Sequence, residues 1–189
     1  ELALRVSAQL KRWQITVDDS AGKPLLQSAN GTLIMALATA MADHFSPVSL
    51  LAIAKHPLVT GDMERRDWLD RARRLDLLLR GPSSGIGLAA IERRIDAMKP
   101  DHPDRAALID WWPVFAKLLK PLAFEDSVSP IDAFAAIAEV AGALTNNAIW
   151  KRAQGRQLAS EWEEITTSDL SAFGRVELQT IPPLLGELL

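Results

Sequence analysis

Apolar residues recur at helical spacing along most of this chain, in segments separated by proline, glycine and capping residues. At the start, a stripe spaced by four, four and three residues predicts an amphipathic helix. This stripe consists of Leu2, Val6, Leu10 and Trp13. The pattern then changes, because Ile15 and Val17 alternate with polar residues, which predicts a short strand.

From residue 30 onward, the periodicity predicts a succession of helices. Ser46-Pro47 and Ser129-Pro130 each place a capping hydroxyl before a proline that suits the first helical position. His56-Pro57, Gly81-Pro82 and Lys99-Pro100 are predicted helix ends. Ile181-Pro182-Pro183 is predicted to break the chain before a last apolar segment at 184–189. The main predicted helices lie in segments 31–45, 47–55, 64–80, 88–99, 104–119, 131–144 and 150–165.

Two short strand signals lie near the two ends of the chain. The second is at 175–181, where Val176 and Leu178 alternate with polar residues. Because a lone strand leaves backbone groups unpaired, either these two segments pair or a partner lies outside this sequence. We therefore predict a mainly α, multi-helix fold with one or two short strands near the termini. Residues 1–29 would form a helix, strand and loop, and residues 30–189 a helical domain.

Composition narrows the function classes without selecting one. The chain has 189 residues, 48% of them hydrophobic, and a formal net charge of -3, so charge alone favours neither nucleic acid nor membrane. No apolar run reaches the roughly 20 residues of a membrane span. The absence of cysteine excludes disulfides and cysteine-bound metals within these residues and fits a cytoplasmic location. Since the chain lacks an initiator Met, we expect a piece of a longer protein; tag removal from a complete protein is the alternative.

No single motif in the sequence gives strong evidence for a metal, phosphate or catalytic site. None of His44, His56 and His102 lies four residues from another, so a helical zinc motif is absent. The segment 83–87 lacks the lysine and preceding strand of a phosphate loop, and we interpret it as a connector. Asp18 and Asp19 are adjacent on a strand end and point to opposite faces, which favours a turn cap over a metal site. We expect no catalytic residue, metal or cofactor here.

The strongest charged feature is a segment rich in arginine and acidic residues at 64–80. Arg66, Arg73 and Arg80 are seven residues apart and share a helix face. The interleaved acids favour a solvated face with ion pairs at four-residue spacing, and phosphate contact is the second interpretation. The residues predicted to touch phosphate are Arg65, Arg66, Arg73 and Arg74.

Tryptophan is enriched, with six residues and no tyrosine. Trp111 and Trp112 are adjacent, so we do not expect both to point inward on one helix. One of them is predicted to pack against another part of a larger protein or to stack on a ligand.

Several segments of the chain resemble the AddB subunit of the AddAB helicase–nuclease, in its alphaproteobacterial form. The similarity is specific at Asp18-Asp19-Ser20-Ala21-Gly22-Lys23-Pro24-Leu25 and at Lys55-His56-Pro57-Leu58, and loose after about residue 122. Other matching stretches are Trp13 to Val17, Pro47 to Ala54, Trp68-Leu69, Leu75 to Pro82 and Trp111-Trp112. The motif residues expected to have a structural role are Asp18, Asp19, Ser20, Gly22, Pro24, His56 and Pro57.

The resemblance implies a role in DNA double-strand break repair. In this family the AddA subunit supplies the ATP-driven motor. AddB has an inactivated superfamily-1 helicase fold and a nuclease domain with an iron–sulfur cluster. This chain resembles the edge of a RecA-like lobe running into the helical insertion, without the nuclease motif or the cluster cysteines. The implied function is non-catalytic: it would brace an AddA-type helicase subunit and guide DNA, with catalysis elsewhere in the parent.

Two rival functions remain open at the level of sequence. The first is a stand-alone helical protein–protein interaction domain without DNA contact. The second is a small-molecule hydrolase, which the lack of an assembled histidine, serine and acid arrangement disfavours.

Overall fold

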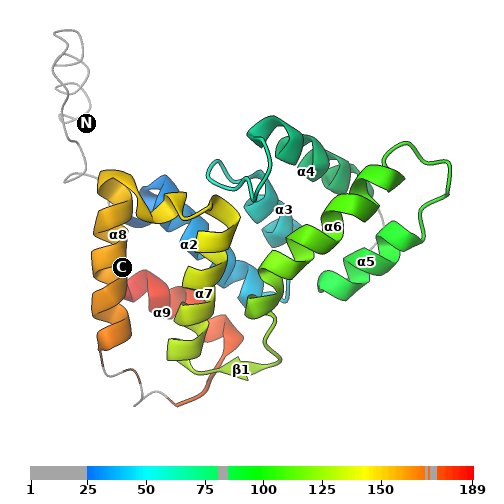
Figure 1. Cartoon of the computed structure of the whole chain (residues 1–189). Coiled ribbons are helices and arrows are strands. Elements are labelled where there is room, and N and C mark those ends of the chain that lie inside the picture. The colour runs from blue at the N-terminus through cyan, green and yellow to red at the C-terminus, as the bar shows by residue number, and fades with distance from the viewer. Residues whose placement is uncertain (1–24, 81–84, 169, 171–173) are drawn as a thin grey trace, which may run out of the picture.

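The computed structural model describes residues 25–80, 85–168, 170 and 174–189, and this part of the chain is mainly helical (Figure 1). The mainly α prediction is confirmed. The predicted helix, strand and loop within residues 2–24 lie outside the described residues, and with them Asp18, Asp19, Ser20, Gly22 and Pro24. The α-helices are α2 Ala29–Ala42, α3 Pro47–Lys55, α4 Arg65–Leu79, α5 Leu88–Asp96, α6 Arg105–Leu119, α7 Pro130–Thr145, α8 Arg152–Thr167 and α9 Ile181–Leu188.

Helix α2 is the central element of the fold. It packs against α3, α7, α8 and α9, and its buried side chains include Leu33, Ile34 and Leu37. In Figure 1, α2, α7, α8 and α9 form one half of the molecule, and α3, α4, α5 and α6 form the other. A helix with apolar residues on most of its circumference needs neighbours on several sides, which explains why α2 contacts α3 of the other half as well as the helices of its own half.

Local capping chemistry sets the helix starts that the sequence predicts. The Ser46 hydroxyl accepts from the backbone N–H of Ser49 at 3.3 Å, with Pro47 at the first position of α3. The Ser129 hydroxyl does the same for Asp132 at 3.1 Å at the start of α7. Both predicted Ser-Pro starts are thereby confirmed, because each satisfies a backbone donor that the first turn leaves without a partner.

The described strands form one short antiparallel pair, β1 Ser127–Val128 with β2 Val176–Glu177. The predicted strand near residue 176 is thus confirmed, but its described partner is a segment that we did not predict to be a strand. Val128 pairs with Val176 in this register. Two residues are too few to show an alternation, which explains why the pattern did not indicate β1.

The C-terminal helix α9 begins earlier in the sequence than predicted. Pro182 and Pro183 lie in the first turn of α9, which begins at Ile181, and do not break the chain before residue 184. Proline is compatible with this position because the first-turn N–H groups have no intrahelical partner.

The prediction that Trp111 and Trp112 do not both point inward is wrong. Both are buried, with exposed fractions of 3% and 2%. Helix α6 contacts α4 on one side and α5 on another. The Trp111 ring lies 5.1 Å from that of Trp68 on α4, and Trp112 lines a small pocket that Ile95 of α5 also borders. A helix packed between two neighbours has two buried faces, so adjacent residues are both covered.

Four 3₁₀ turns connect the described elements: η2 Leu25–Gln27, η3 Lys120–Leu122, η4 Ala148–Trp150 and η6 Leu178–Thr180. Among the described residues, no helix combines the length and the apolar character that crossing a membrane requires.

Candidate functional site

Arg65 forms hydrogen bonds to backbone carbonyl groups of the same chain. Its guanidinium donates to the carbonyl oxygens of Val59 and Lys55, the latter at 3.0 Å. These carbonyls belong to the end of α3 and the loop after it, where backbone acceptors lack helical partners. Burial lowers the pKa of the Arg65 guanidinium. Arg65 therefore holds the connection between α3 and α4 together.

Arg74 also has partners within the chain, in this case two acidic side chains. Its Nε donates to Asp70 Oδ2 at 2.7 Å, and its Nη1 donates to Asp104 at the start of α6. The hydrogen bond from Arg74 lowers the pKa of the Asp70 carboxyl, and the same bond raises the pKa of Arg74. This ion-pair network joins α4 to α6 and neutralises Arg74.

Asp76 forms a second network on the same helix. Its carboxylate accepts from Lys55 Nζ at 2.7 Å and from Arg80 Nη2 at 2.9 Å. These hydrogen bonds, first that from Arg80, lower the pKa of Asp76 to about 2. Arg80 is therefore paired with an acid, as the interpretation of a solvated helix face predicted.

Arg66 and Arg73 differ from these paired arginines. Both are exposed, and neither forms an ion pair with a described residue. Phosphate contact by the four candidate arginines of α4, which are Arg65, Arg66, Arg73 and Arg74, remains a prediction, and the geometry distinguishes them. Arg66 and Arg73 have free guanidinium groups, whereas Arg65 and Arg74 would have to give up internal partners.

His56, in the Lys-His-Pro-Leu segment, caps the end of α3. The backbone N–H of Leu58 donates to His56 Nδ1 at 3.3 Å, and Nε2 lies 3.1 Å from the Thr32 hydroxyl. Burial, followed by the positive charge of Arg65, lowers the pKa of His56 to about 4. His56 is thus a neutral, hydrogen-bonded link between α2 and α3 at pH 7, while Pro57 beside it is exposed.

The described residues contain no group of three or more His, Asp or Glu side chains that could hold a metal ion. His44, His56 and His102 belong to different connections of the fold: His44 follows α2, His56 follows α3 and His102 precedes α6.

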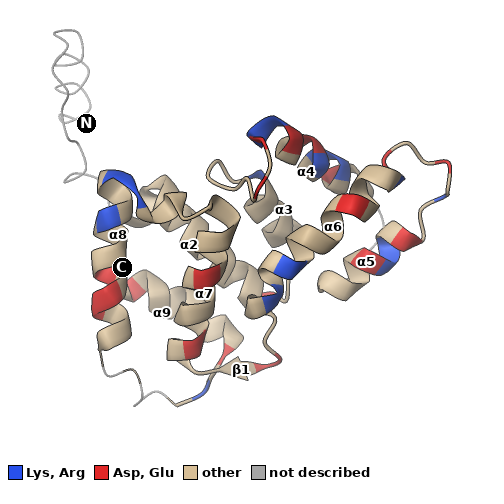
Figure 2. Ribbon diagram, in the orientation of Figure 1, with Lys and Arg blue, Asp and Glu red and all other residues tan. Residues whose placement is uncertain are grey.

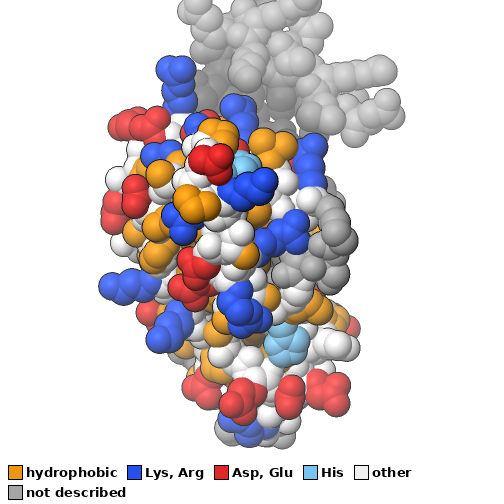
Figure 3. Space-filling model, turned by 90° about the vertical axis from the view of Figure 1, so that its right-hand side faces the viewer, with side chains coloured by type: hydrophobic (Ala, Val, Ile, Leu, Met, Phe, Trp, Pro, Cys, Tyr) orange, Lys and Arg blue, Asp and Glu red, His pale blue; other side chains and the backbone are white. Residues whose placement is uncertain are grey.

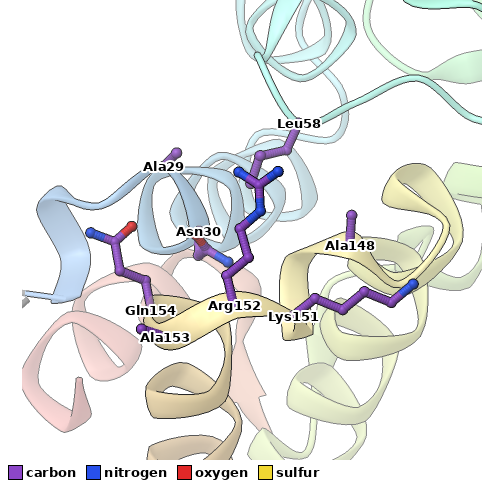
Figure 4. Close-up of a pocket in the computed structure, with 8 residues that line it drawn as sticks. All are labelled: Ala29, Asn30, Leu58, Ala148, Lys151, Arg152, Ala153 and Gln154. Carbon is purple, nitrogen blue, oxygen red and sulfur yellow. The ribbon is translucent and has the colours of Figure 1, made fainter. Parts of the chain in front are cut away.

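A pocket of about 520 Å³ lies between the first turn of α2 and the start of α8. In Figure 4 the Arg152 side chain rises across this pocket between Asn30 and Leu58, while Lys151 extends toward Ala148. Asn30 is buried, and its Nδ2 donates to the carbonyl oxygen of Ile149, which fixes one wall. The lining residues are Ala29, Asn30, Leu58, Ala148, Lys151, Arg152, Ala153 and Gln154.

The start of α8 carries positive charge that has no acidic ion-pair partner among the described residues. Lys151, Arg152 and Arg156 lie in the segment 150–160, which contains no Asp or Glu. All three are exposed, and none forms an ion pair with a described residue. No side chain caps the first turn of α8. An anionic group here would meet cations and the positive end of a helix together.

We did not identify this basic segment from the sequence, although its signal was present there. Three bases with no acid in eleven residues is a local excess that the overall charge of -3 conceals. The ends of α8 and α4 that contain Arg152 and Arg66 both lie along the upper edge of the molecule in Figure 2.

No protein-family model, curated protein or solved structure matches this chain.

Proposed function

We propose that this chain is a non-catalytic, helicase-like segment of an AddB-type subunit of a cytoplasmic DNA double-strand break repair helicase–nuclease. In this proposal it braces an AddA-type motor subunit and contacts DNA through phosphate groups. The resemblance of the Pro47 to Leu58 and Leu75 to Pro82 stretches to that family supports the identification, since it provides the specific link to DNA repair.

One observation carries the DNA part of the proposal: Lys151, Arg152 and Arg156 are exposed cations without acidic partners among the described residues. Lys and Arg bind phosphate oxygens through charge-assisted hydrogen bonds, and they do so most strongly when no carboxylate competes. Arg65 and Arg74 do not meet that condition, and Arg73 lies close enough to the Asp70 carboxylate to lower its pKa.

The end of the molecule formed by α4, α5 and α6 has a mixed surface. Figure 3 shows Lys and Arg side chains there interspersed with Asp and Glu. Such a surface attracts a polyanion weakly, because each phosphate meets both signs of charge within a few ångströms. The proposal therefore assigns the main phosphate contact to the start of α8 and an auxiliary one to Arg66 and Arg73.

The test measures binding of labelled single-stranded and duplex DNA to the full chain by fluorescence anisotropy at several salt concentrations. We expect weak, salt-dependent binding that falls by about tenfold or more in the triple variant Lys151→Ala, Arg152→Ala, Arg156→Ala. The matched control is Arg93→Ala on α5, which also removes an exposed cation. The DNA part is overturned if the chain does not bind at low salt or if the control weakens binding equally.

A protein–protein interaction domain without DNA contact is the second candidate. The observation that favours it is the exposure of large apolar side chains, with Val48 80% exposed and Ile86 65% exposed. Exposed large apolar side chains gain free energy when a partner covers them. DNA affinity lost in the triple variant would exclude this candidate, whereas absence of DNA binding would support it.

A further inference from the structure

The pocket at the start of α8 combines a concave shape with charge of one sign. Its volume of about 520 Å³ lies within the range of pockets that hold small ligands. The first turn of α2, Ala148 of η4 and the first turn of α8 line it, and Leu58 adds an apolar side chain (Figure 4). Lys151 and Arg152 are among its described lining residues, and no Asp or Glu is. The concavity and the positive charge therefore belong to the same few residues.

The two cations of the pocket are available to a ligand. Lys151 and Arg152 are exposed, and neither forms an ion pair with a described residue. In Figure 4 the Arg152 side chain crosses the pocket. The first-turn N–H groups of α8 lack intrahelical acceptors, and no side chain caps them. A doubly charged anion gains more from this arrangement than a singly charged one, because each added charge meets both cations and the helix dipole.

Asn30, on the α2 wall, gives an observation that does not depend on charge. Its residue is 7% exposed, and its Nδ2 donates to the Ile149 carbonyl oxygen, which fixes the plane of the amide. Its Oδ1 accepts no hydrogen bond from a described residue, so this oxygen is open to an N–H or O–H donor that enters the pocket. Because a buried acceptor without a donor costs free energy, the pocket favours a ligand that has a donor as well as an anion.

We propose that this pocket binds a nucleotide that carries a phosphomonoester. The phosphate lies against Lys151 and Arg152, and a base amino group or a sugar hydroxyl donates to Asn30 Oδ1. The inference rests on the phosphate contact in the proposed function and deepens it by naming the kind of phosphate. A free mononucleotide and the phosphorylated end of a strand both offer this chemistry, and the experiment distinguishes them.

Two features select a terminal phosphate over an internal one. An internal phosphodiester carries one negative charge, whereas a phosphomonoester carries about 1.5 to 2 at pH 7. An internal phosphate also has chain on both sides. Because α2, η4 and α8 bound the pocket, a strand end can place one nucleotide inside it without a second exit for the chain.

The probes are short single-stranded oligonucleotides of one sequence with a 5′-phosphate, with a 3′-phosphate or with neither. All share the same internal phosphates, so any difference in affinity comes from the terminal group. Binding to the full chain is measured by fluorescence anisotropy with an internal label. We expect at least one phosphorylated form to bind about fivefold or more tightly than the unphosphorylated form. The end that gains affinity gives the polarity of the bound strand.

Free dAMP, with deoxyadenosine as its control, distinguishes the two sources. We expect dAMP, but not deoxyadenosine, to shift the NMR signal of the Asn30 side-chain amide. Binding of dAMP without any oligonucleotide would support the pocket as a mononucleotide site and overturn the DNA part of the proposed function. Preference for a phosphorylated oligonucleotide without binding of dAMP would identify the strand end as the ligand.

The failure of this inference differs from the failure of the proposed function. Equal affinity for the three oligonucleotides, together with no binding of dAMP, would overturn the phosphomonoester pocket and leave general phosphate contact standing. If neither dAMP nor any oligonucleotide binds, both are overturned.

Paired variants locate the preference in the pocket. Lys151→Ala combined with Arg152→Ala should abolish the preference for the phosphorylated end. Arg156→Ala removes an exposed cation of α8 that does not line the pocket, so it should weaken all three oligonucleotides and keep the preference. Ala148→Phe fills the pocket and keeps both cations, and it should abolish the preference while general binding persists. Its control is Ala143→Phe at an exposed position of α7. A preference that survives Ala148→Phe, or that either control removes, would overturn the proposal.

Discussion

The indole N–H of Trp68 donates to the backbone carbonyl oxygen of Ala54 at 2.7 Å, across the contact between α4 and α3. Ala54 lies in the last turn of α3, where carbonyl groups lack an intrahelical partner. We expect Trp68→Phe to lower the free energy of unfolding by about 2–3 kcal/mol, because it leaves this buried acceptor unpaired and removes packing volume. Urea denaturation followed by circular dichroism measures the change.

The substitution Trp111→Phe is the matched comparison for Trp68→Phe. Its ring packs against Trp68 at 5.1 Å, but its indole N–H has no hydrogen-bond partner among the described residues. Trp111→Phe therefore removes a desolvated donor together with the packing, and we expect a smaller loss of about 1 kcal/mol. Equal losses in the two variants would contradict the assignment of the Trp68 hydrogen bond.

Gly155 allows close approach of the chain at the start of α8. A Cβ atom at this position would lie 2.5 Å from the Ile149 carbonyl oxygen and 2.7 Å from the Trp150 carbonyl carbon. Because both atoms are backbone, they move only if the η4 turn shifts. We expect Gly155→Ala to destabilise the fold by about 1–3 kcal/mol, opposite to the usual effect of alanine in a helix.

Gly186 in α9 is the control for that substitution. A Cβ atom there would meet only Met35 Cε, at 4.0 Å, which is ordinary contact. Gly186→Ala should stabilise the protein by about 0.5–1 kcal/mol through the higher helix propensity of alanine. Thermal unfolding of the two variants measures the opposite signs, and destabilisation by Gly186→Ala would show that propensity does not govern this site.

The lowered pKa of His56, about 4 in the folded state, predicts a pH dependence of stability. In the unfolded chain the imidazole titrates near its ordinary pKa of about 6.5, so between these values the unfolded state binds more protons. Stability is therefore complete above pH 7 and decreases as the pH falls toward 4. Asp76 contributes little above about pH 5, where its carboxyl is ionised in both states, but its pKa of about 2 in the folded state adds to the loss of stability below that pH.

The measurement is the urea midpoint of the wild type and of His56→Gln between pH 8 and about 5. We expect the midpoint of the wild type to fall more steeply with decreasing pH than that of the variant. Above pH 7 the difference between the two proteins should stay constant. Parallel curves over the whole range would show that another group controls the acid sensitivity.

The order of the helices was predictable because its signals are local. Ser46 and Ser129 act as caps through bonds to residues three positions away, and the His56-Pro57 pair ends α3 by its own backbone preferences. The short β1–β2 pair was not predictable in the same way. Its partners, Val128 and Val176, are brought together only by the packing of the helices between them.

The candidate site depends even more on distant contacts. Arg74 is neutralised partly by Asp104, thirty residues away, so the sequence could not separate it from the unpaired Arg73. The burial of Trp112 likewise depends on the position of α5 relative to α6. Residue type and helical spacing identified the arginines of α4 as candidates, but the tertiary structure determines which of them keep a free guanidinium group.

The adjacent residues Arg65 and Arg66 should therefore respond in opposite ways to the same substitution. Arg65→Ala removes hydrogen bonds to the carbonyls of Lys55 and Val59, so we expect it to cost about 1–2 kcal/mol of stability without changing the salt dependence of DNA binding. Arg66→Ala removes an exposed, unpaired cation, so stability should change by less than about 0.5 kcal/mol. In that variant the slope of log affinity against log salt should fall by about one unit.

Both variants are compared by urea denaturation and by DNA titration over a range of salt concentrations. A stability loss in Arg66→Ala would mean that its guanidinium has an internal role. A reduced salt slope in Arg65→Ala at unchanged stability would mean that this arginine releases its carbonyl partners to bind phosphate. Either result would reverse the division of the α4 arginines into structural and phosphate-contacting residues, which rests on the hydrogen bonds of Arg65 to the end of α3.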